Sequence, residues 1–187
     1  MGNPFTRDEI ARELTKVGKA VGQPSEAFIV GGGAMVVHGF KESTPDLDLI
    51  VPNKETFDEF DRAMITSGYS RGMERIEAQG VGSMRQYHNP SGQKTEICYQ
   101  GIGGDIILTE GIRSRAYAAF SQRDLTVSAI SPEDLYVSKL VSGRAKDVLD
   151  TTTLWMDGLD RNIIESERAV QQARLDQEVP DTVFFEL

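Results

Sequence analysis

The sequence feature that most constrains the fold is an apolar run that ends in three glycines, FIVGGG at residues 28–33. The run is typical of a short buried strand, and the glycines indicate a tight turn. Residues 34–38 fit one or two helical turns, and residues 45–52, PDLDLIVP, fit a strand bounded by prolines. Because side chains alternate along a strand, Asp46 and Asp48 should share one face while the intervening leucines face the core.

Two carboxylates on one face of a strand repel each other unless a positive charge lies between them. Mg²⁺ meets this need, because it binds carboxylate oxygens and keeps coordination sites for water and phosphate. A glycine turn followed by a helix N-terminus lets backbone N–H groups approach an anion closely. The order of these features predicts a phosphate site beside a metal site, which is the combination needed for phosphoryl or nucleotidyl transfer.

The rest of the pattern indicates an α+β protein, with strands in the middle of the chain and helices at its end. Thr6 and Glu9 have the form of a capping box, and Ser131-Pro132 is a typical helix start. The predicted helices cover residues 7–21, 54–67, 132–142, 145–156 and 160–176. The further predicted strands are a hairpin formed by 84–88 and 95–99, and the runs 106–108 and 125–130.

Composition restricts the functional class. The one cysteine, Cys98, cannot form an internal disulfide, and no apolar run reaches the roughly 20 residues of a membrane span, so we expect a cytoplasmic protein. The net charge of −9 argues against a long, nonspecific grip on nucleic acid. The excess acid lies towards the two ends, because residues 71–147 carry 10 basic and 9 acidic side chains. An RNA substrate should therefore be held locally, near its reacting end.

Residues 30–51, VGGGAMVVHGFKESTPDLDLIV, resemble the signature of the nucleotidyltransferase fold in the DNA polymerase β-like superfamily. That signature is a Gly-Gly turn and a short helix followed by Thr-x-Asp-Leu-Asp-Leu. The chain is similar to small nucleotidyltransferases that include toxins of type IV abortive-infection toxin–antitoxin systems, and residues 131–155 resemble a helical segment of those proteins. The resemblance implies a mixed β-sheet flanked by helices, with a catalytic core at residues 1–130 and a C-terminal helical segment at residues 131–187 packed on it.

The resemblance also implies a set of acidic site residues. Asp46 and Asp48 would hold Mg²⁺, with room for a two-metal site, and a third carboxylate on a later strand would complete the set. Glu96 follows a hairpin turn, as the third acid does in similar proteins, whereas Asp105 has the usual residue type but follows two glycines. We favour Glu96 as the third metal ligand and keep Asp105 as the other candidate. The structural alternative for Glu96 is a cross-strand pairing with Arg85.

The nucleoside triphosphate would be held by residues of both matching segments, 30–51 and 131–155. Gly31, Gly32 and Thr44 belong to the matching signature, and Lys139 would neutralise the charge of the triphosphate or of the departing pyrophosphate. Many relatives carry an arginine between the short helix and the threonine. Here Lys41 takes that place, and a lysine supplies a point charge without the bidentate fork of an arginine.

Structural alternatives stay open for the charged residues of segment 131–155. Lys139 fits a solvated helix lysine as well as a phosphate ligand. Arg144, Asp147 and Asp150 resemble the arginine and paired aspartates of the similar proteins, and they also fit an ion-paired helix face.

The sequence therefore predicts a Mg²⁺-dependent nucleotidyltransferase that transfers a nucleoside monophosphate from a nucleoside triphosphate to a hydroxyl of a tRNA, a protein or a small molecule. By resemblance, we also expect a toxin role with a cognate antitoxin as partner, and no membrane partner. The alternative is a non-catalytic module of the same fold that binds a nucleotide or a protein. The glutamate at the third acidic position and the missing arginine favour that alternative.

Overall fold

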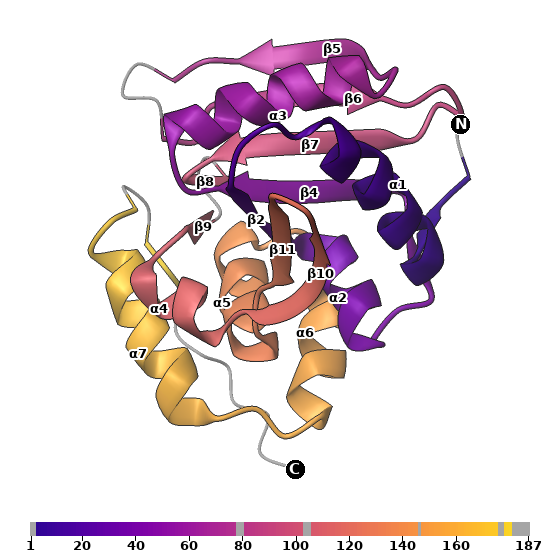
Figure 1. Ribbon diagram of the computed structural model, residues 1–187. Coiled ribbons are helices and arrows are strands. Elements are labelled where there is room, and N and C mark those ends of the chain that lie inside the picture. Colours follow the sequence, from indigo (N-terminus) through magenta and orange to yellow (C-terminus); the bar gives the residue numbers. More distant parts are fainter. Residues whose placement is uncertain (1–2, 78–80, 103–105, 146, 176–177, 181–187) are drawn as a thin grey trace.

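The computed structural model describes residues 3–77, 81–102, 106–145, 147–175 and 178–180. A seven-stranded mixed sheet forms its centre (Figure 1). The strands are, in spatial order, β10 (Tyr117–Gln122), β11 (Leu125–Ala129), β2 (Ser25–Val30), β4 (Asp46–Val51), β7 (Lys94–Tyr99), β6 (Met84–His88) and β5 (Ser70–Arg75). The pairs β11–β2 and β4–β7 are parallel, and the other neighbours are antiparallel. The predicted α+β class with a mixed sheet is confirmed.

Helices flank this sheet. They are α1 (Arg7–Ala20), α2 (Gly31–His38), α3 (Lys54–Thr66), α4 (Glu110–Arg115), α5 (Pro132–Ser142), α6 (Asp147–Met156) and α7 (Arg161–Gln172). Two short antiparallel ladders join β1 (Phe5–Thr6) to β3 (Ser43–Thr44) and β8 (Gly101–Ile102) to β9 (Ile106–Ile107). Figure 1 shows α1 and α3 across the strands at the top of the view, with the C-terminal helices grouped below. Among the described residues, no helix has both the length and the apolar character needed to cross a membrane.

Strand β4 separates the hydrophobic core from the polar side of the sheet. Leu47 and Leu49 are buried and face α1 and α3, where Phe60 lines the same small cavity. Because neighbouring side chains alternate along β4, Asp46 and Asp48 point to the opposite face of the sheet. The burial of the two leucines therefore fixes which way the two carboxylates point, since a shift of one residue would exchange the faces.

The passage from β2 into α2 differs from the predicted glycine turn before a helix at residues 34–38. The glycines already form the first turn of α2, which begins at Gly31 directly after its N-cap residue Val30. Gly31 has a φ of 57°, a left-handed conformation that glycine adopts without steric cost. Val30 pairs in register with Asp48 of β4. The direct transition from β2 into α2 thus places the N-terminus of α2 beside an aspartate of the predicted site.

Six elements were not predicted from the sequence, namely the two-residue strands β1, β3 and β8 and the longer elements β5, β10 and α4. Every residue of β5 is exposed, and this edge strand has no apolar alternation to mark it. The residues of β10 are exposed or half-buried. Helix α4 spans only six residues, which is too short for a helical period to show. Each element depends on its neighbours for its position, so its own sequence carries little signal.

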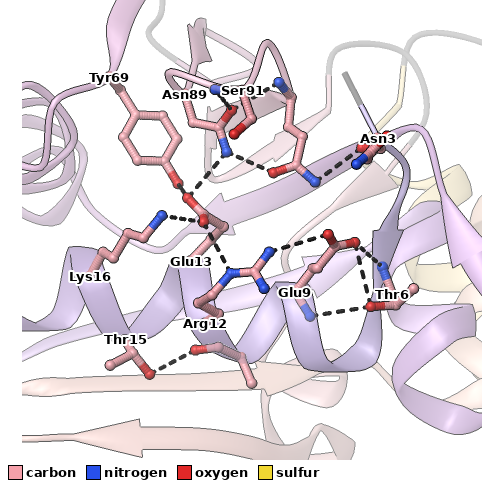
Figure 2. A network of polar contacts seen from close by, with 12 residues as sticks. Asn3, Thr6, Glu9, Arg12, Glu13, Thr15, Lys16, Tyr69, Asn89 and Ser91 are labelled. Atoms are coloured by element: carbon pink, nitrogen blue, oxygen red, sulfur yellow. Dashed lines mark hydrogen bonds and ion pairs between the residues drawn. The ribbon is translucent and has the colours of Figure 1, made fainter. Parts of the chain in front are cut away.

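A buried polar network fixes the turn of the β6–β7 hairpin to α1 (Figure 2). Glu13 of α1 is buried and accepts hydrogen bonds from the Tyr69 hydroxyl at 2.6 Å and from Asn89 Nδ2 at 3.2 Å. Asn89 Nδ2 also donates to Gln93 Oε1 at 2.7 Å, one residue before β7 begins. Burial by itself would raise the pKa of Glu13, but the hydrogen bonds from Lys16, Tyr69 and Asn89 outweigh it and lower that pKa. The network therefore holds the start of β7 in place.

Candidate active site

A cleft with a volume of about 370 Å³ is lined by the polar face of β4 and β7, by the N-terminus of α2, and by side chains of α5 and α6. Most of the residues predicted for the site meet there. They are Gly31, Gly32, Lys41, Thr44, Asp46, Asp48, Glu96 and Lys139. Asp105, the other candidate for the third acid, lies outside the described residues.

Four charged side chains form the sheet wall of the cleft. Strands β4 and β7 are parallel neighbours in which Asp46 pairs in register with Lys94, and Asp48 with Glu96. Alternation along both strands places all four side chains on the same face. The pairing thus brings Glu96 beside the two aspartates, although α3, β5 and β6 separate them in the sequence.

Lys94 bridges two of these carboxylates. Its Nζ lies 2.9 Å from Asp46 Oδ2 and 3.1 Å from Glu96 Oε1. Burial by itself would lower the pKa of the Lys94 ammonium, but the hydrogen bonds and charges of Asp46 and Glu96 outweigh it and raise that pKa. The ammonium is therefore charged at neutral pH. It offsets part of the repulsion among Asp46, Asp48 and Glu96, which together we call the acidic face.

The predicted alternative for Glu96, a structural pairing with Arg85, is wrong. Arg85 lies opposite Ile97 in the β6–β7 register, whereas Glu96 lies opposite Gln86. Gln86 Nε2 donates to Glu96 Oε1 at 3.0 Å. Arg85 contacts Glu74 on the neighbouring strand instead. Glu96 therefore faces the cleft, and Gln86 and Lys94 orient its carboxylate.

The N-terminus of α2 approaches the acidic face closely because Gly32 has no side chain. A Cβ atom at Gly32 would lie 2.3 Å from Thr44 Oγ1, well inside contact distance. Thr44 is buried and belongs to β3, directly before the strand that carries the aspartates. The N-cap residue Val30 provides no side-chain hydrogen bond to the N-terminus of α2. Its first N–H groups and the positive end of the helix dipole therefore suit an anion at this edge of the cleft.

The helical wall of the cleft is an ion-pair network. Lys139 is only 5% exposed and donates to Asp147 Oδ1 at 3.0 Å and to Asp150 Oδ2 at 2.6 Å. Lys41 reaches Asp150 from the segment after α2, at 2.7 Å and 2.8 Å to its two oxygens. The alternative of a solvated Lys139 is therefore wrong. Arg144 Nε lies 2.7 Å from Asp147 Oδ2, so the ion-paired helix face exists and lines the cleft as well.

Asp147 is held as an anion by this network. Burial by itself would raise its pKa, but hydrogen bonds from Ser142, Arg144 and Lys139 outweigh burial and hold the pKa of Asp147 well below its usual range. The Ser142 hydroxyl donates to Asp147 Oδ2 at 2.7 Å. Asp147 is therefore ionised across the physiological pH range, and it fixes the start of α6 against the end of α5.

The acidic face has the donor chemistry for Mg²⁺. Carboxylate oxygens are the ligands that this ion prefers, and it is commonly held by one or two carboxylates together with substrate phosphates. Asp46 and Asp48 supply such a pair. Within the part of the chain that the structure describes, no three acidic, histidine or cysteine side chains converge closely enough to hold a metal ion by themselves. The residues therefore fit a metal ion that arrives with phosphate ligands.

Sequence reasoning missed Lys94 and Gln86. Lys94 precedes Glu96 by two residues, so alternation alone predicts that the two share a face once Glu96 is placed in a strand. Gln86 could be found only from the register of the hairpin, which depends on the turn at residues 89–92. Both residues contact Glu96, and each therefore shapes the acidic face.

Comparisons with known proteins bear on the fold alone. No protein-family model and no curated protein sequence matches the chain significantly. Among solved structures, the candidate nucleotidyltransferase TM1012 from Thermotoga maritima is similar over 84% of this chain and 98% of its own, with 16% identity and a TM-score of 0.55. The lincosamide antibiotic adenylyltransferase LnuA, solved with lincomycin bound, is similar over 82% of this chain and 98% of its own, with 15% identity and a TM-score of 0.55. The chain therefore has the nucleotidyltransferase fold.

Proposed function

Starting from this fold, we propose that the chain is a Mg²⁺-dependent nucleotidyltransferase that transfers a nucleoside monophosphate from a nucleoside triphosphate to an acceptor hydroxyl and releases pyrophosphate. One observation carries the proposal. Asp46 and Asp48 project into a cleft beside the N-terminus of α2, and the lysines Lys41 and Lys139 line the same cleft. A carboxylate pair for a divalent metal, an anion site and two cations together suit a bound metal–triphosphate.

The acidic face would serve the reacting hydroxyl. Asp46 and Asp48 are the proposed ligands of Mg²⁺, which when bound would neutralise phosphate charge and lower the pKa of the acceptor hydroxyl. Glu96, as third acid, would take the hydroxyl proton or join the metal ligands, as the sequence resemblance implies. The hydroxyl oxygen would form a bond to the α-phosphorus, and the bond from that phosphorus to the bridging oxygen of pyrophosphate would break. Gln86 and Lys94 would keep the Glu96 carboxylate oriented.

The remaining residues of the cleft would hold the triphosphate. The backbone N–H groups at Gly31 and Gly32 suit its phosphate oxygens, and Thr44 would line the same edge. Lys41 and Lys139 would neutralise the charge that develops on the departing pyrophosphate. In this proposal the catalytic core spans residues 1–130, and the helical segment from residue 131 onwards contributes Lys139 to the site.

The acceptor is proposed by class. A hydroxyl of a small molecule, a tRNA or a protein fits the chemistry, and a small-molecule acceptor is supported by the likeness to LnuA, a lincosamide antibiotic adenylyltransferase. The toxin role and a cognate antitoxin rest on the sequence resemblance to abortive-infection proteins. A panel of acceptors from all three classes is therefore the first experiment.

The test incubates the protein with Mg²⁺, each nucleoside triphosphate and each acceptor class, and follows formation of the nucleotidylated acceptor. Asp48→Asn should lower the rate about 10²-fold or more, the typical effect of losing a group that stabilises transition-state charge. Asp58→Asn is the matched control, because Asp58 is an exposed aspartate of α3 paired with Lys54 outside the cleft. Absence of product with every nucleotide, together with nucleotide binding unaffected by Asp46→Asn and Asp48→Asn, would refute the proposal.

A non-catalytic nucleotide-binding module is the second candidate. The bridge from Lys94 to Asp46 and Glu96 favours it, because an internal cation already occupies part of the acidic face. This candidate predicts that nucleoside triphosphates bind without turnover and that Mg²⁺ does not strengthen their binding. Isothermal titration with and without Mg²⁺ separates it from the enzyme.

A further inference from the structure

The ammonium group of Lys94 lies between two of the three acids that are proposed as metal ligands. Its Nζ contacts Asp46 at 2.9 Å and Glu96 at 3.1 Å. The position follows from the sheet itself, because Lys94 is the register partner of Asp46 and precedes Glu96 by two residues on the same face of β7. The bridge is therefore built into the pairing of β4 with β7 and does not depend on a loop.

We propose that Lys94 is the resident counter-ion of the metal-free site and competes with the divalent cation for Asp46 and Glu96. In the metal-free protein the ammonium holds the acidic face together. The Lys94 ammonium would leave these two carboxylates when they hold the divalent cation. This inference rests on the proposed function, since it assigns a metal to the same acids.

The charge of Lys94 should weaken metal binding and stabilise the metal-free site. Three carboxylates on one face of two neighbouring strands repel one another, and Lys94 offsets one of their three charges. A divalent cation approaching Asp46 and Glu96 meets that positive charge in the place it would itself occupy. The ammonium therefore weakens metal binding to the free protein, while it stabilises the face when no metal is bound.

Lys94 also has a route out of the site. Its side chain is 32% exposed, so the ammonium can move towards solvent without crossing the core. The four-carbon stem of a lysine is flexible and its charge is compact, which suits a group that exchanges one partner for another. Gln86 donates to Glu96 from β6 and would keep that carboxylate in position after Lys94 has left.

The experiment measures Mn²⁺ binding without nucleotide, by electron paramagnetic resonance of the free ion, in wild type, Lys94→Met and Lys54→Met. Lys94→Met removes a unit positive charge a few ångströms from the ion. Its dissociation constant for Mn²⁺ should therefore be lower than that of wild type by about tenfold or more. Lys54→Met removes a lysine from an exposed ion pair with Asp58 and should bind Mn²⁺ like wild type. If Lys94→Met does not fold, Lys94→Gln carries the same expectation, because it also removes the positive charge and keeps a hydrogen-bond donor at this position.

Thermal unfolding gives a second readout. Without metal, Lys94→Met should unfold at a lower temperature than wild type, and Mn²⁺ should raise its midpoint by more than it raises that of wild type. Equal or weaker Mn²⁺ binding by Lys94→Met, with Asp48→Asn still abolishing the binding seen in wild type, would overturn the role of Lys94 alone. Failure of both wild type and Lys94→Met to bind Mn²⁺ without nucleotide would overturn this inference, whereas failure of Mn²⁺ to strengthen nucleoside triphosphate binding by wild type would overturn the metal site of the proposed function.

Discussion

Asp48 and Glu96 are register partners on the parallel strands β4 and β7, and both side chains line the cleft. The β6–β7 hairpin, which is tied to α1 through the buried Glu13, delivers Glu96 to this position. A third carboxylate thus stands beside the two aspartates within regular secondary structure. This geometry supports Glu96 as the third acid of the proposed site.

Asp150 should be a sensitive residue of the helical wall. It is buried and accepts from both Lys41 and Lys139, so Asp150→Asn would leave two lysines without their shared anion. Removing one partner of a buried ion pair costs about 3 kcal/mol or more, so we expect the free energy of unfolding in urea to fall by that amount. Asp58→Asn, at an exposed ion pair, should change it by less than about 0.5 kcal/mol. Equal effects of the two substitutions would contradict the network.

Gly32→Ala should distort the N-terminus of α2, where we expect the anion to bind. The added Cβ would lie 2.3 Å from Thr44 Oγ1, so the start of α2 must move away from β3. We expect a loss of about 1–3 kcal/mol in stability and a weaker affinity for nucleoside triphosphates, measured by urea unfolding and by titration.

Two variants control the Gly32 experiment. Gly18→Ala in α1 brings the new Cβ no closer than 3.5 Å to another side chain, and it should leave stability unchanged or raise it by up to about 1 kcal/mol. In the double variant Gly32→Ala with Thr44→Ala, the nearest remaining contact is the Thr44 Cβ at 3.1 Å, so part of the loss should be recovered. No recovery in the double variant would show that the steric contact is not the cause.

Glu13→Gln should change how stability depends on pH. Because the pKa of Glu13 is lowered from its ordinary value of 4.5, its ionised form stabilises the fold above about pH 4.5, and that contribution disappears as the pH falls through the folded-state pKa. The variant should therefore lose about 1–2 kcal/mol relative to wild type near neutral pH, and the difference should shrink in acid. Urea unfolding of wild type and variant from acid to neutral pH measures this difference in the free energy of unfolding. Glu55→Gln in α3 is the control for removal of a charge. A difference that is constant with pH would contradict the stated role.

The acidic face and most helices could be predicted from the sequence because their signals are local. Alternation around Leu47 and Leu49 puts the aspartates on one face, and the capping box at Thr6 marks the start of α1. The helix predicted at residues 132–142 coincides with α5, whose N-cap Ser131 and following proline are local signals as well. Such patterns depend only on residues within one or two turns of each other.

The remaining parts depend on pairing between distant segments. The bridge made by Lys94 requires the register of β4 with β7, and the contact from Gln86 requires that of β6 with β7. The partners of Lys41 and Lys139 meet only when α5 and α6 pack against the segment after α2. The exposed edge strand β5 has no apolar pattern of its own. Tertiary contacts define these features, so one sequence read locally does not contain them.

The most direct test of nucleotidyl transfer follows two labels in parallel. The protein is incubated with Mg²⁺, an acceptor and a nucleoside triphosphate labelled either at the α-phosphate or at the γ-phosphate. We predict that the α-label appears on the acceptor, that the γ-label appears in pyrophosphate, and that Asp48→Asn slows formation of both products about 10²-fold or more. Transfer of the γ-label to the acceptor, or no transfer of either label to any acceptor, would contradict nucleotidyl transfer.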